Sequence, residues 1–388
     1  MHRKCQTQSQ LRRYGYARHF TVTKLVVVLV NVLIVWYLVA HVRSRCDLGN
    51  NSRYTVPTAA RQHFTDIGVR TRFVTRGEKC EAMKNLVLTI ISACALVCSV
   101  SAQSSLFNRY DVTMKWGQLP ADLPWDGVTT WVAADGKGHV IVMVRKAPYI
   151  RVFTTDGKFV KAWGDTPLFK EAHSAHFDRE GNLWGVDTAD HVVERFDADG
   201  KVVLTLGKRG VTGDNASRDA FNRPATAFFA ANGDIYVADG YINARVVQFT
   251  KEGKFVRIIG GVKGKGPGEM QLVHGVVVDS KGRILVADSD NQRLSVFDKG
   301  GNFLETWSVP CRGNIDITPD DTVFVSDVNA GGVTILKEGK IVDFIHVEGR
   351  PHGMSIDESN GDVYTSSSDG KNPNVSKASL KKKVVVSQ

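Results

Sequence analysis

A short pattern recurs six times between residues 128 and 367, and this repeat constrains the fold more than any other feature of the sequence. Each copy has an apolar run, a turn rich in Asp, Asn or Gly, and a second apolar run that usually ends at Asp. Turns of this composition between alternating apolar runs are typical of β-hairpins, because these residues tolerate positive φ angles. The copies are VTTWVAADGKGHVIVMV (128–144), SAHFDREGNLWGVD (174–187), ATAFFAANGDIYVAD (225–239), GVVVDSKGRILVAD (275–288), DITPDDTVFVSD (316–327) and GMSIDESNGDVYTSS (353–367).

The first five copies are each followed by two further apolar segments joined by a Gly-containing turn, as in VVQFTKEGKFVRIIG (246–260). Each unit therefore predicts four short antiparallel strands, and a spacing of roughly 40–50 residues between such units is typical of propeller blades. Six units predict an all-β, six-bladed β-propeller over residues 109–380. The last unit has sequence for only three strands, so YDVTMKW (110–116) is predicted to supply the fourth and close the ring.

Charge and cysteine are concentrated before the repeats. Residues 1–102 contain 15 Lys and Arg against 4 Asp and Glu, whereas residues 103–388 contain 35 against 36. The near-neutral repeat region therefore gives no indication of nucleic-acid binding, although the chain as a whole is basic. Cys311 is the one cysteine after residue 102, so the propeller cannot depend on internal disulfides.

Two hydrophobic segments precede the repeats and predict export. Residues 22–42 include an apolar run, flanked by basic residues, that is just long enough to cross a bilayer. Residues 83–102 combine Lys84, an apolar stretch and the small-residue site Val-Ser-Ala, which is the pattern of a secretory signal peptide. Either Met83 is the true start and residues 1–82 are an upstream extension, or residues 22–42 anchor the chain in a membrane. Both alternatives place the propeller outside the cytoplasm, in the periplasm or secreted.

Three histidines occupy one position of the repeat on alternate units. At the start of the innermost strand, where a propeller faces its central channel, the units carry Val128, His173, Ala225, His274, Asn314 and His352. Units two, four and six of a six-fold ring lie 120° apart, so their imidazoles should converge on the axis. Three imidazoles with a fourth, open position are a common catalytic zinc arrangement. The sequence therefore predicts a zinc site made by the three histidines.

The repeats resemble NHL repeats, and residues 125–380 resemble peptidyl-α-hydroxyglycine α-amidating lyase, the second catalytic domain of the peptide-amidating enzyme. The phrase VADGYINARVVQF (237–249) is similar to the family's blade with the catalytic tyrosine, which implies that role for Tyr241. HVIVMVRK implies that Arg145 is the active-site arginine, and the three histidines match the zinc ligands. The family also implies a calcium ion, bound partly by a carboxylate after the third histidine. This chain has Gly353 there, which leaves calcium in doubt, and Ile242 replaces a cysteine of the family.

The resemblance implies a carbon–nitrogen lyase that splits an α-hydroxyglycine amide into an amide and glyoxylate. Such a reaction needs a group that takes the hydroxyl proton, and a tyrosine near a cation can do so. It also needs a group that holds a carboxylate, which arginine does through two parallel hydrogen bonds. The expected partner is a small-molecule or peptide-derived substrate, and the expected state is a monomeric propeller that meets a membrane only through its N-terminal segment. The alternative is a non-catalytic NHL propeller that binds a protein, peptide or glycan on its loop face.

Overall fold

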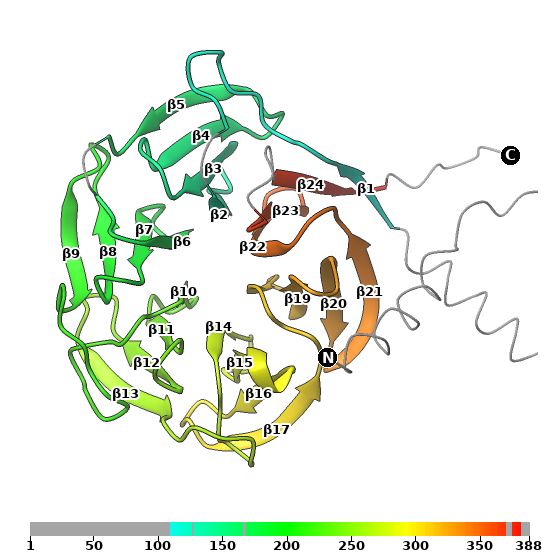
Figure 1. Cartoon of the computed structure of the whole chain (residues 1–388). Coiled ribbons are helices and arrows are strands. Elements are labelled where there is room, and N and C mark those ends of the chain that lie inside the picture. The colour runs from blue at the N-terminus through cyan, green and yellow to red at the C-terminus, as the bar shows by residue number, and fades with distance from the viewer. Residues whose placement is uncertain (1–108, 126–127, 166–167, 370–374, 382–388) are drawn as a thin grey trace, which may run out of the picture. The chain divides into compact units, whose positions relative to one another are not determined.

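The computed structural model describes residues 109–125, 128–165, 168–369 and 375–381, which form six four-stranded antiparallel sheets around a central axis (Figure 1). This arrangement confirms the predicted all-β, six-bladed propeller. The predicted membrane segment and signal peptide, within residues 1–102, lie outside the described residues.

The strands of each blade follow one another from the axis outward, with the innermost strand first. Blade 1 is β2 (Thr129–Ala134), β3 (His139–Val144), β4 (Ile150–Thr154) and β5 (Phe159–Trp163). Blade 2 is β6 (Ala172–Phe177), β7 (Leu183–Asp187), β8 (Val192–Phe196) and β9 (Val202–Gly207). Blade 3 is β10 (Thr226–Phe229), β11 (Ile235–Asp239), β12 (Arg245–Phe249) and β13 (Phe255–Gly260). Blade 4 is β14 (Val273–Val278), β15 (Ile284–Asp288), β16 (Arg293–Phe297) and β17 (Phe303–Ser308). Blade 5 is β18 (Ile315–Ile317), β19 (Thr322–Asp327), β20 (Gly332–Lys337) and β21 (Lys340–His346). Blade 6 is β22 (Pro351–Asp357), β23 (Asp362–Ser367), β24 (Val375–Leu380) and β1 (Tyr110–Thr113).

Blade 6 is assembled from both ends of the repeat region. Strand β1 pairs antiparallel with β24 from Tyr110 opposite Leu380 to Thr113 opposite Lys377. The backbone N–H of Trp116 then donates to the carbonyl of Val375 at 2.8 Å, which extends the contact beyond the strand. The predicted closure of the ring by residues 110–116 is therefore confirmed, and it joins the first strand to the last blade.

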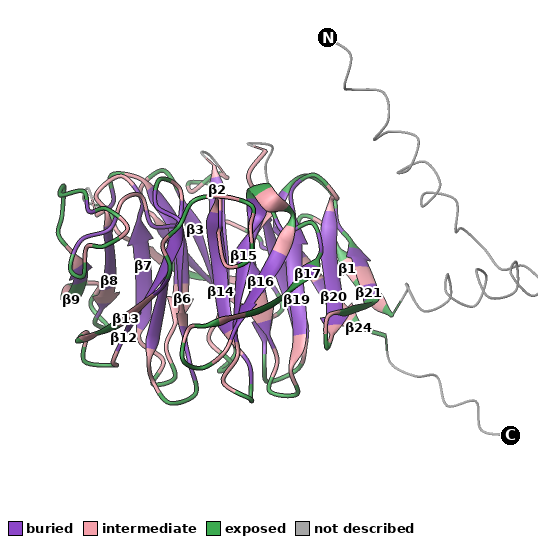
Figure 2. Cartoon of the chain, turned by 90° about the horizontal axis from the view of Figure 1, so that it is seen from below, coloured by how far each residue is buried: buried purple, intermediate pink, exposed green. Residues whose placement is uncertain are grey.

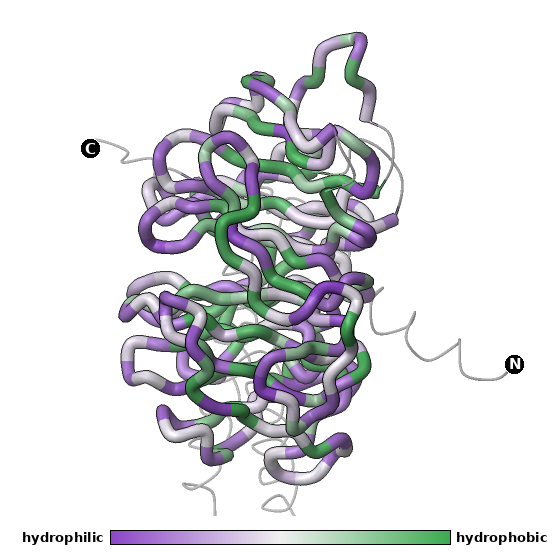
Figure 3. The backbone as a smooth tube through the Cα atoms, turned by 90° about the vertical axis from the view of Figure 1, so that its left-hand side faces the viewer, coloured by the Kyte–Doolittle hydropathy of each residue, from purple (hydrophilic) through white to green (hydrophobic). Residues whose placement is uncertain are grey.

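The hydrophobic core lies between neighbouring blades. Every residue of β11 and β15 is buried, because each blade packs against another on both faces. Trp184 of blade 2, for example, meets Phe229 of blade 3 at a ring-centroid distance of 5.1 Å. Figure 2 shows the buried strands between exposed loops, and Figure 3 shows the hydrophobic residues within the blades and the hydrophilic ones at the turns. Burial is thus spread over all the contacts between blades, as in other repeat folds.

A recurrent aspartate ends the second strand of four blades and caps the backbone. Its carboxylate accepts N–H groups from the segment that leads into the first strand of the same blade. The bonds run to Asp187 from Lys170 (2.6 Å) and Glu171 (3.0 Å), to Asp239 from Asn222 (2.9 Å), to Asp288 from Gln271 (2.8 Å) and to Asp327 from Arg312 (2.8 Å). These carboxylates satisfy backbone donors and hold the channel-lining strands in place.

Helical structure is almost absent from the described residues, which contain one short 3₁₀ turn, η1 (Ser289–Asn291). Within the same residues, no helix has the length and apolar character needed to cross a membrane.

Candidate metal centre

The three histidines sit on β-bulges at the start of their strands. In blades 2, 4 and 6 the register with the second strand skips one residue, and that residue is His173, His274 or His352. A bulge leaves the extra residue out of the ladder and re-aims its side chain, here toward the channel. We call this bulged site, and its equivalents in the other blades, the channel position.

The bulge also corrects the prediction for blade 1. There the register skips Thr130, so Thr130 occupies the channel position and Val128 lies two residues before it. The error arises because the whole of β2 up to Ala133 is buried, so the apolar run shows no alternation from which a bulge can be located. The channel positions are Thr130, His173, Ala225, His274, Asn314 and His352.

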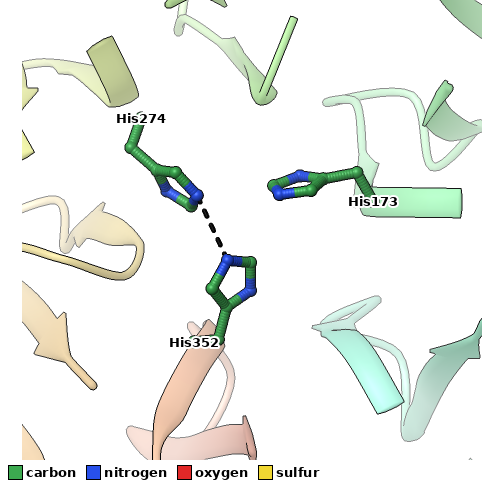
Figure 4. Close-up of side chains that lie close together, drawn as sticks. All are labelled: His173, His274 and His352. Atoms are coloured by element: carbon green, nitrogen blue, oxygen red, sulfur yellow. Dashed lines mark hydrogen bonds between the residues drawn. The ribbon is translucent and has the colours of Figure 1, made fainter. Parts of the chain in front are cut away.

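The imidazoles of His173, His274 and His352 converge in the channel (Figure 4). One ligand nitrogen from each lies within 4.8 Å of the other two, and the Nε2 atoms of His274 and His352 are 3.1 Å apart. The Tyr241 hydroxyl lies 2.8 Å from His173 Nε2 and 3.1 Å from His274 Nε2. The structure therefore brings together four of the five predicted site residues at one point.

Backbone carbonyls of the neighbouring blades fix the tautomer of each histidine. A carbonyl oxygen only accepts, so the Nδ1 atom beside it carries the proton and Nε2 keeps its lone pair. Such an outer hydrogen bond is a usual feature of histidines that ligate metals. The Nδ1 contacts run from His173 to the Ala225 carbonyl (2.6 Å), from His274 to the Gly313 carbonyl (2.7 Å) and from His352 to the Thr130 carbonyl (3.3 Å).

Burial keeps these imidazoles neutral. It lowers the pKa of His274 to about 3 and that of His352 to about 4, and it lowers the pKa of His173 well below its usual value. The lone pairs of His274 and His352 therefore face each other at 3.1 Å with no proton between them at neutral pH. A cation shared by the histidines removes this conflict, and three neutral imidazoles are a donor set that zinc prefers. The residues present thus fit a zinc ion.

Around this centre, each blade contributes two further positions that are linked by one hydrogen bond. The entrance position is the residue that lies two before the channel position. The turn position is the residue after the second strand whose backbone N–H donates to the carbonyl of the entrance position. The pairs, turn position first, are Arg145 and Val128, Thr188 and Glu171, Tyr241 and Arg223, Ser289 and Leu272, Val328 and Arg312, and Ser368 and Arg350. Arg145 and Tyr241 are therefore equivalent residues of blades 1 and 3, although Gly240 is inserted before Tyr241.

Glu171 and Arg223 belong to the site, and sequence reasoning missed both. The Glu171 carboxylate lies 3.3 Å from Arg145 and 2.6 Å from Arg223, so it binds both guanidinium groups. Arg223 in turn lies 6.0 Å from the ring centroid of Tyr241. Both residues lie two before the channel position of their blade, and this shared position in the repeat could have identified them from the sequence. Glu171 thus joins Arg145 to Arg223, the guanidinium that lies over the Tyr241 ring.

Burial raises the pKa of Tyr241 to about 12, and the charges of Arg145, Arg223 and Arg312 act in the opposite direction. The phenol is therefore protonated at neutral pH unless further positive charge is present.

One of the calcium ligands implied by the family cannot be supplied at the same position here. A Cβ atom at Gly353 would lie 2.7 Å from the Cα of Trp131 and 2.8 Å from the carbonyl oxygen of Thr130. Because these are backbone atoms, no side chain fits and no carboxylate can be placed there. Ile242, at the family's cysteine position, is 50% exposed.

Comparisons with known proteins agree with the propeller. A family model described as a 6-bladed beta-propeller matches residues 228–321. NHL repeat-containing protein 3 from Homo sapiens is 29% identical over 284 residues, which cover 66% of this chain and 80% of that protein. Among solved structures, a gluconolactonase from Xanthomonas campestris has a TM-score of 0.51 at 14% identity over 71% of this chain and 91% of its own, which shows the fold alone.

Amidating lyases are similar over shorter stretches. A probable peptidyl-alpha-hydroxyglycine alpha-amidating lyase from Caenorhabditis elegans is 30% identical over 154 residues, covering 39% of this chain and 43% of that protein. Peptidyl-alpha-hydroxyglycine alpha-amidating lyase 1 from Drosophila melanogaster is 32% identical over 181 residues, covering 39% of this chain and 32% of that protein. The chain is thus a six-bladed β-propeller with NHL-repeat homologues and a distant similarity to the peptidyl-α-hydroxyglycine α-amidating lyases.

Proposed function

We propose that this chain is an exported, zinc-dependent carbon–nitrogen lyase that cleaves N-acyl-α-hydroxyglycines to an amide and glyoxylate. One observation carries the proposal. Three neutral histidines on alternate blades turn their Nε2 lone pairs toward a common point, and each Nδ1 proton is held by a backbone carbonyl. Zinc bound there would supply positive charge that polarises the oxygens of the substrate.

The reaction moves one proton and breaks one bond. The α-hydroxyl loses its proton, its oxygen forms the aldehyde C=O bond of glyoxylate, and the C–N bond breaks with its electron pair on the amide nitrogen, which takes up a proton. Tyr241 is our candidate for moving the hydroxyl proton, because its hydroxyl adjoins two of the three Nε2 atoms. Its action as a base requires a lower pKa than burial alone gives, and nearby cations lower the pKa of a phenol.

Arg145 is our candidate for holding the substrate carboxylate. Its side chain is 42% exposed, so a ligand can reach it, and its guanidinium is held by Glu171 at 3.3 Å. A planar guanidinium binds a carboxylate through two parallel hydrogen bonds, and this geometry orients the α-carbon as well as the charge.

The second candidate function is a non-catalytic propeller that binds a protein, peptide or glycan on its loop face. It is favoured by the share of each relative that the match covers. The match covers 80% of NHL repeat-containing protein 3, but only 43% and 32% of the two amidating lyases. In this case the histidines would hold a metal with no catalytic role.

Zinc content and glyoxylate release distinguish the two functions. We expect the purified chain to contain one zinc ion and to release glyoxylate from N-benzoyl-α-hydroxyglycine. The variant His274→Ala should lose both properties, whereas His139→Ala, at a 47% exposed histidine of the same propeller, should keep both. Zinc without glyoxylate release from any N-acyl-α-hydroxyglycine would favour the binding propeller, and absence of zinc from the wild-type chain would reject the metal centre.

A further inference from the structure

The entrance positions of blades 3, 5 and 6 are all arginine. Arg223, Arg312 and Arg350 precede the channel position by two residues, and the backbone of each is fixed by the same hydrogen bond from the turn position. Equivalent positions of a ring of blades lie around one opening, so these arginines surround the entrance to the histidine cluster. Glu171 of blade 2 is the one carboxylate among the six entrance positions.

The arginines differ in how far their charge is already neutralised. Arg223 is bound to Glu171 at 2.6 Å. Arg312 has a longer contact with Asp290, at 3.4 Å, and its side chain is 53% exposed. Arg350 is exposed, and its side chain forms no ion pair with any of the described residues, while its backbone N–H donates to Ser367 at 2.7 Å. Among the three entrance arginines, Arg223 is therefore the one held most closely by a carboxylate, and Arg312 and Arg350 are the two whose guanidinium groups are more available to a ligand.

These two blades are firmly joined beneath the arginines. The Asn314 amide donates to the carbonyl of Met354 at 2.8 Å, and the Ser326 hydroxyl donates to the carbonyl of His352 at 3.3 Å. The backbone segments that carry Arg312 and Arg350 are therefore fixed relative to each other and to His352.

We propose that Arg312 and Arg350 form a second anion site at the entrance, which recognises a carboxylate on the acyl part of the substrate. The inference rests on the proposed function and deepens it. Arg145 takes the α-carboxylate next to the scissile bond, and the arginines of blades 5 and 6 take a carboxylate farther along the molecule. The preferred substrate class is therefore an N-acyl-α-hydroxyglycine whose acyl group is acidic.

Binding of unreactive analogues tests the site without depending on catalysis. N-succinylglycine is compared with its monoamide, in which the succinyl carboxyl is an amide and the glycine carboxylate is kept. The two compounds have nearly the same size and differ by one negative charge. We expect calorimetry at low ionic strength to give at least about tenfold tighter binding of N-succinylglycine, because hydrogen bonds between charged groups contribute more than neutral ones. Added salt should reduce this preference, since the entrance is open to solvent.

Substitution assigns the preference to the two arginines. In the double variant Arg312→Gln/Arg350→Gln, we expect N-succinylglycine and its monoamide to bind equally. The matched control is Arg179→Gln, because Arg179 has a similar exposure of 45% and a single ionic partner, Glu358, at the opposite end of the channel. This control should keep the wild-type preference.

Two results overturn the inference: equal binding of both compounds by the wild-type chain, and a preference that persists in the double variant. Failure of the proposed function is seen separately, as absence of glyoxylate release from N-benzoyl-α-hydroxyglycine. The wild-type chain could release no glyoxylate and still prefer N-succinylglycine, with the double variant losing that preference. This result would support the anion site and reject the lyase function.

Discussion

The hydroxyl of Tyr241 is placed to exchange a proton with a ligand at the histidine cluster. It lies 2.8 Å from His173 Nε2 and 3.1 Å from His274 Nε2. Both nitrogens are free to accept a proton, because each Nδ1 is bonded to a backbone carbonyl. Arg223 lies over its ring, and Glu171 connects Arg223 with Arg145. A group so close to the histidines can exchange a proton with anything bound there.

Replacing Tyr241 with Phe should separate proton transfer from metal binding. We expect Tyr241→Phe to keep its zinc and to lose about 10²–10⁴-fold in the rate of glyoxylate release, the usual contribution of a general acid or base. The matched control is Tyr149→Phe, because the Tyr149 hydroxyl donates to a backbone carbonyl at 3.3 Å away from the histidines. If Tyr241→Phe retained most of the activity, Tyr241 would not be the proton-transfer group.

The lowered pKa values of the histidines predict a loss of stability in acid for the metal-free protein. Because the folded-state pKa of about 3 for His274 and about 4 for His352 lies below the usual 6.5, the unfolded chain binds more protons below pH 6.5. The stabilisation is present above about pH 6.5 and is lost as the pH falls toward 4, by about 1.4 kcal/mol per pH unit for each histidine.

Urea unfolding of the metal-free chain between pH 7 and pH 4 measures this loss. Asp316 is half-buried, and desolvation raises its pKa to about 6, so it works in the opposite direction and offsets part of the loss. The variant His274→Ala should show a smaller slope than the wild type, and an equal slope would mean that the histidine titrates at its usual pKa.

The sequence repeat was enough to predict the strands and their order in the blades, but not every residue of the candidate site. The blades and the closing strand β1 follow from turns and apolar runs that recur at a fixed spacing. The equivalence of His173, His274 and His352 follows from the same spacing, because each histidine directly precedes its copy of the repeat. Thr130 was missed because a bulge in a strand buried on both faces leaves no trace in the alternation. The pairing of Glu171 with Arg223 was missed because it joins side chains 52 residues apart, across a contact between blades.

The aspartate caps of the second strands give a prediction about stability. Asp288 is fully buried and accepts from the backbone of Gln271, from Asn291 and from Arg293 at 2.7–2.9 Å. Asp288→Ala would remove the acceptor of the Gln271 N–H and the ionic partner of Arg293, whose guanidinium would keep only backbone carbonyls as acceptors. We expect this loss to cost about 3 kcal/mol.

Thermal unfolding compares this variant with Asp298→Ala. Asp298 also accepts two backbone N–H groups, but it does so in an exposed turn between strands. We expect a much smaller change there, because water replaces the lost bonds. Equal effects of the two substitutions would show that the buried aspartate is not a structural cap.

For the whole molecule, the metal centre would link blades that are not neighbours. Blades 2, 4 and 6 each contribute one histidine, so a zinc ion bound to all three would connect three points of the ring at its axis. Among the described residues, the ion pair between Arg179 of blade 2 and Glu358 of blade 6 also joins two blades that are not neighbours, but both of its side chains are largely exposed. Bound zinc would therefore stabilise the folded ring in addition to any catalytic role, since the unfolded chain does not present the three nitrogens together.

Removal of zinc should accordingly lower the melting temperature without unfolding the blades. Free zinc at a hundred times its dissociation constant stabilises by about 2.7 kcal/mol, which corresponds to about 5 °C or more for a domain of this size. We expect a chelator to lower the Tm of the wild-type chain by this amount while the far-UV circular dichroism at 25 °C stays the same. His274→Ala should melt at one temperature with or without chelator, because it lacks a ligand, and His139→Ala should respond as the wild type does. A chelator that left the wild-type Tm unchanged, or that lowered the Tm of His274→Ala equally, would show that no ion holds the three blades together.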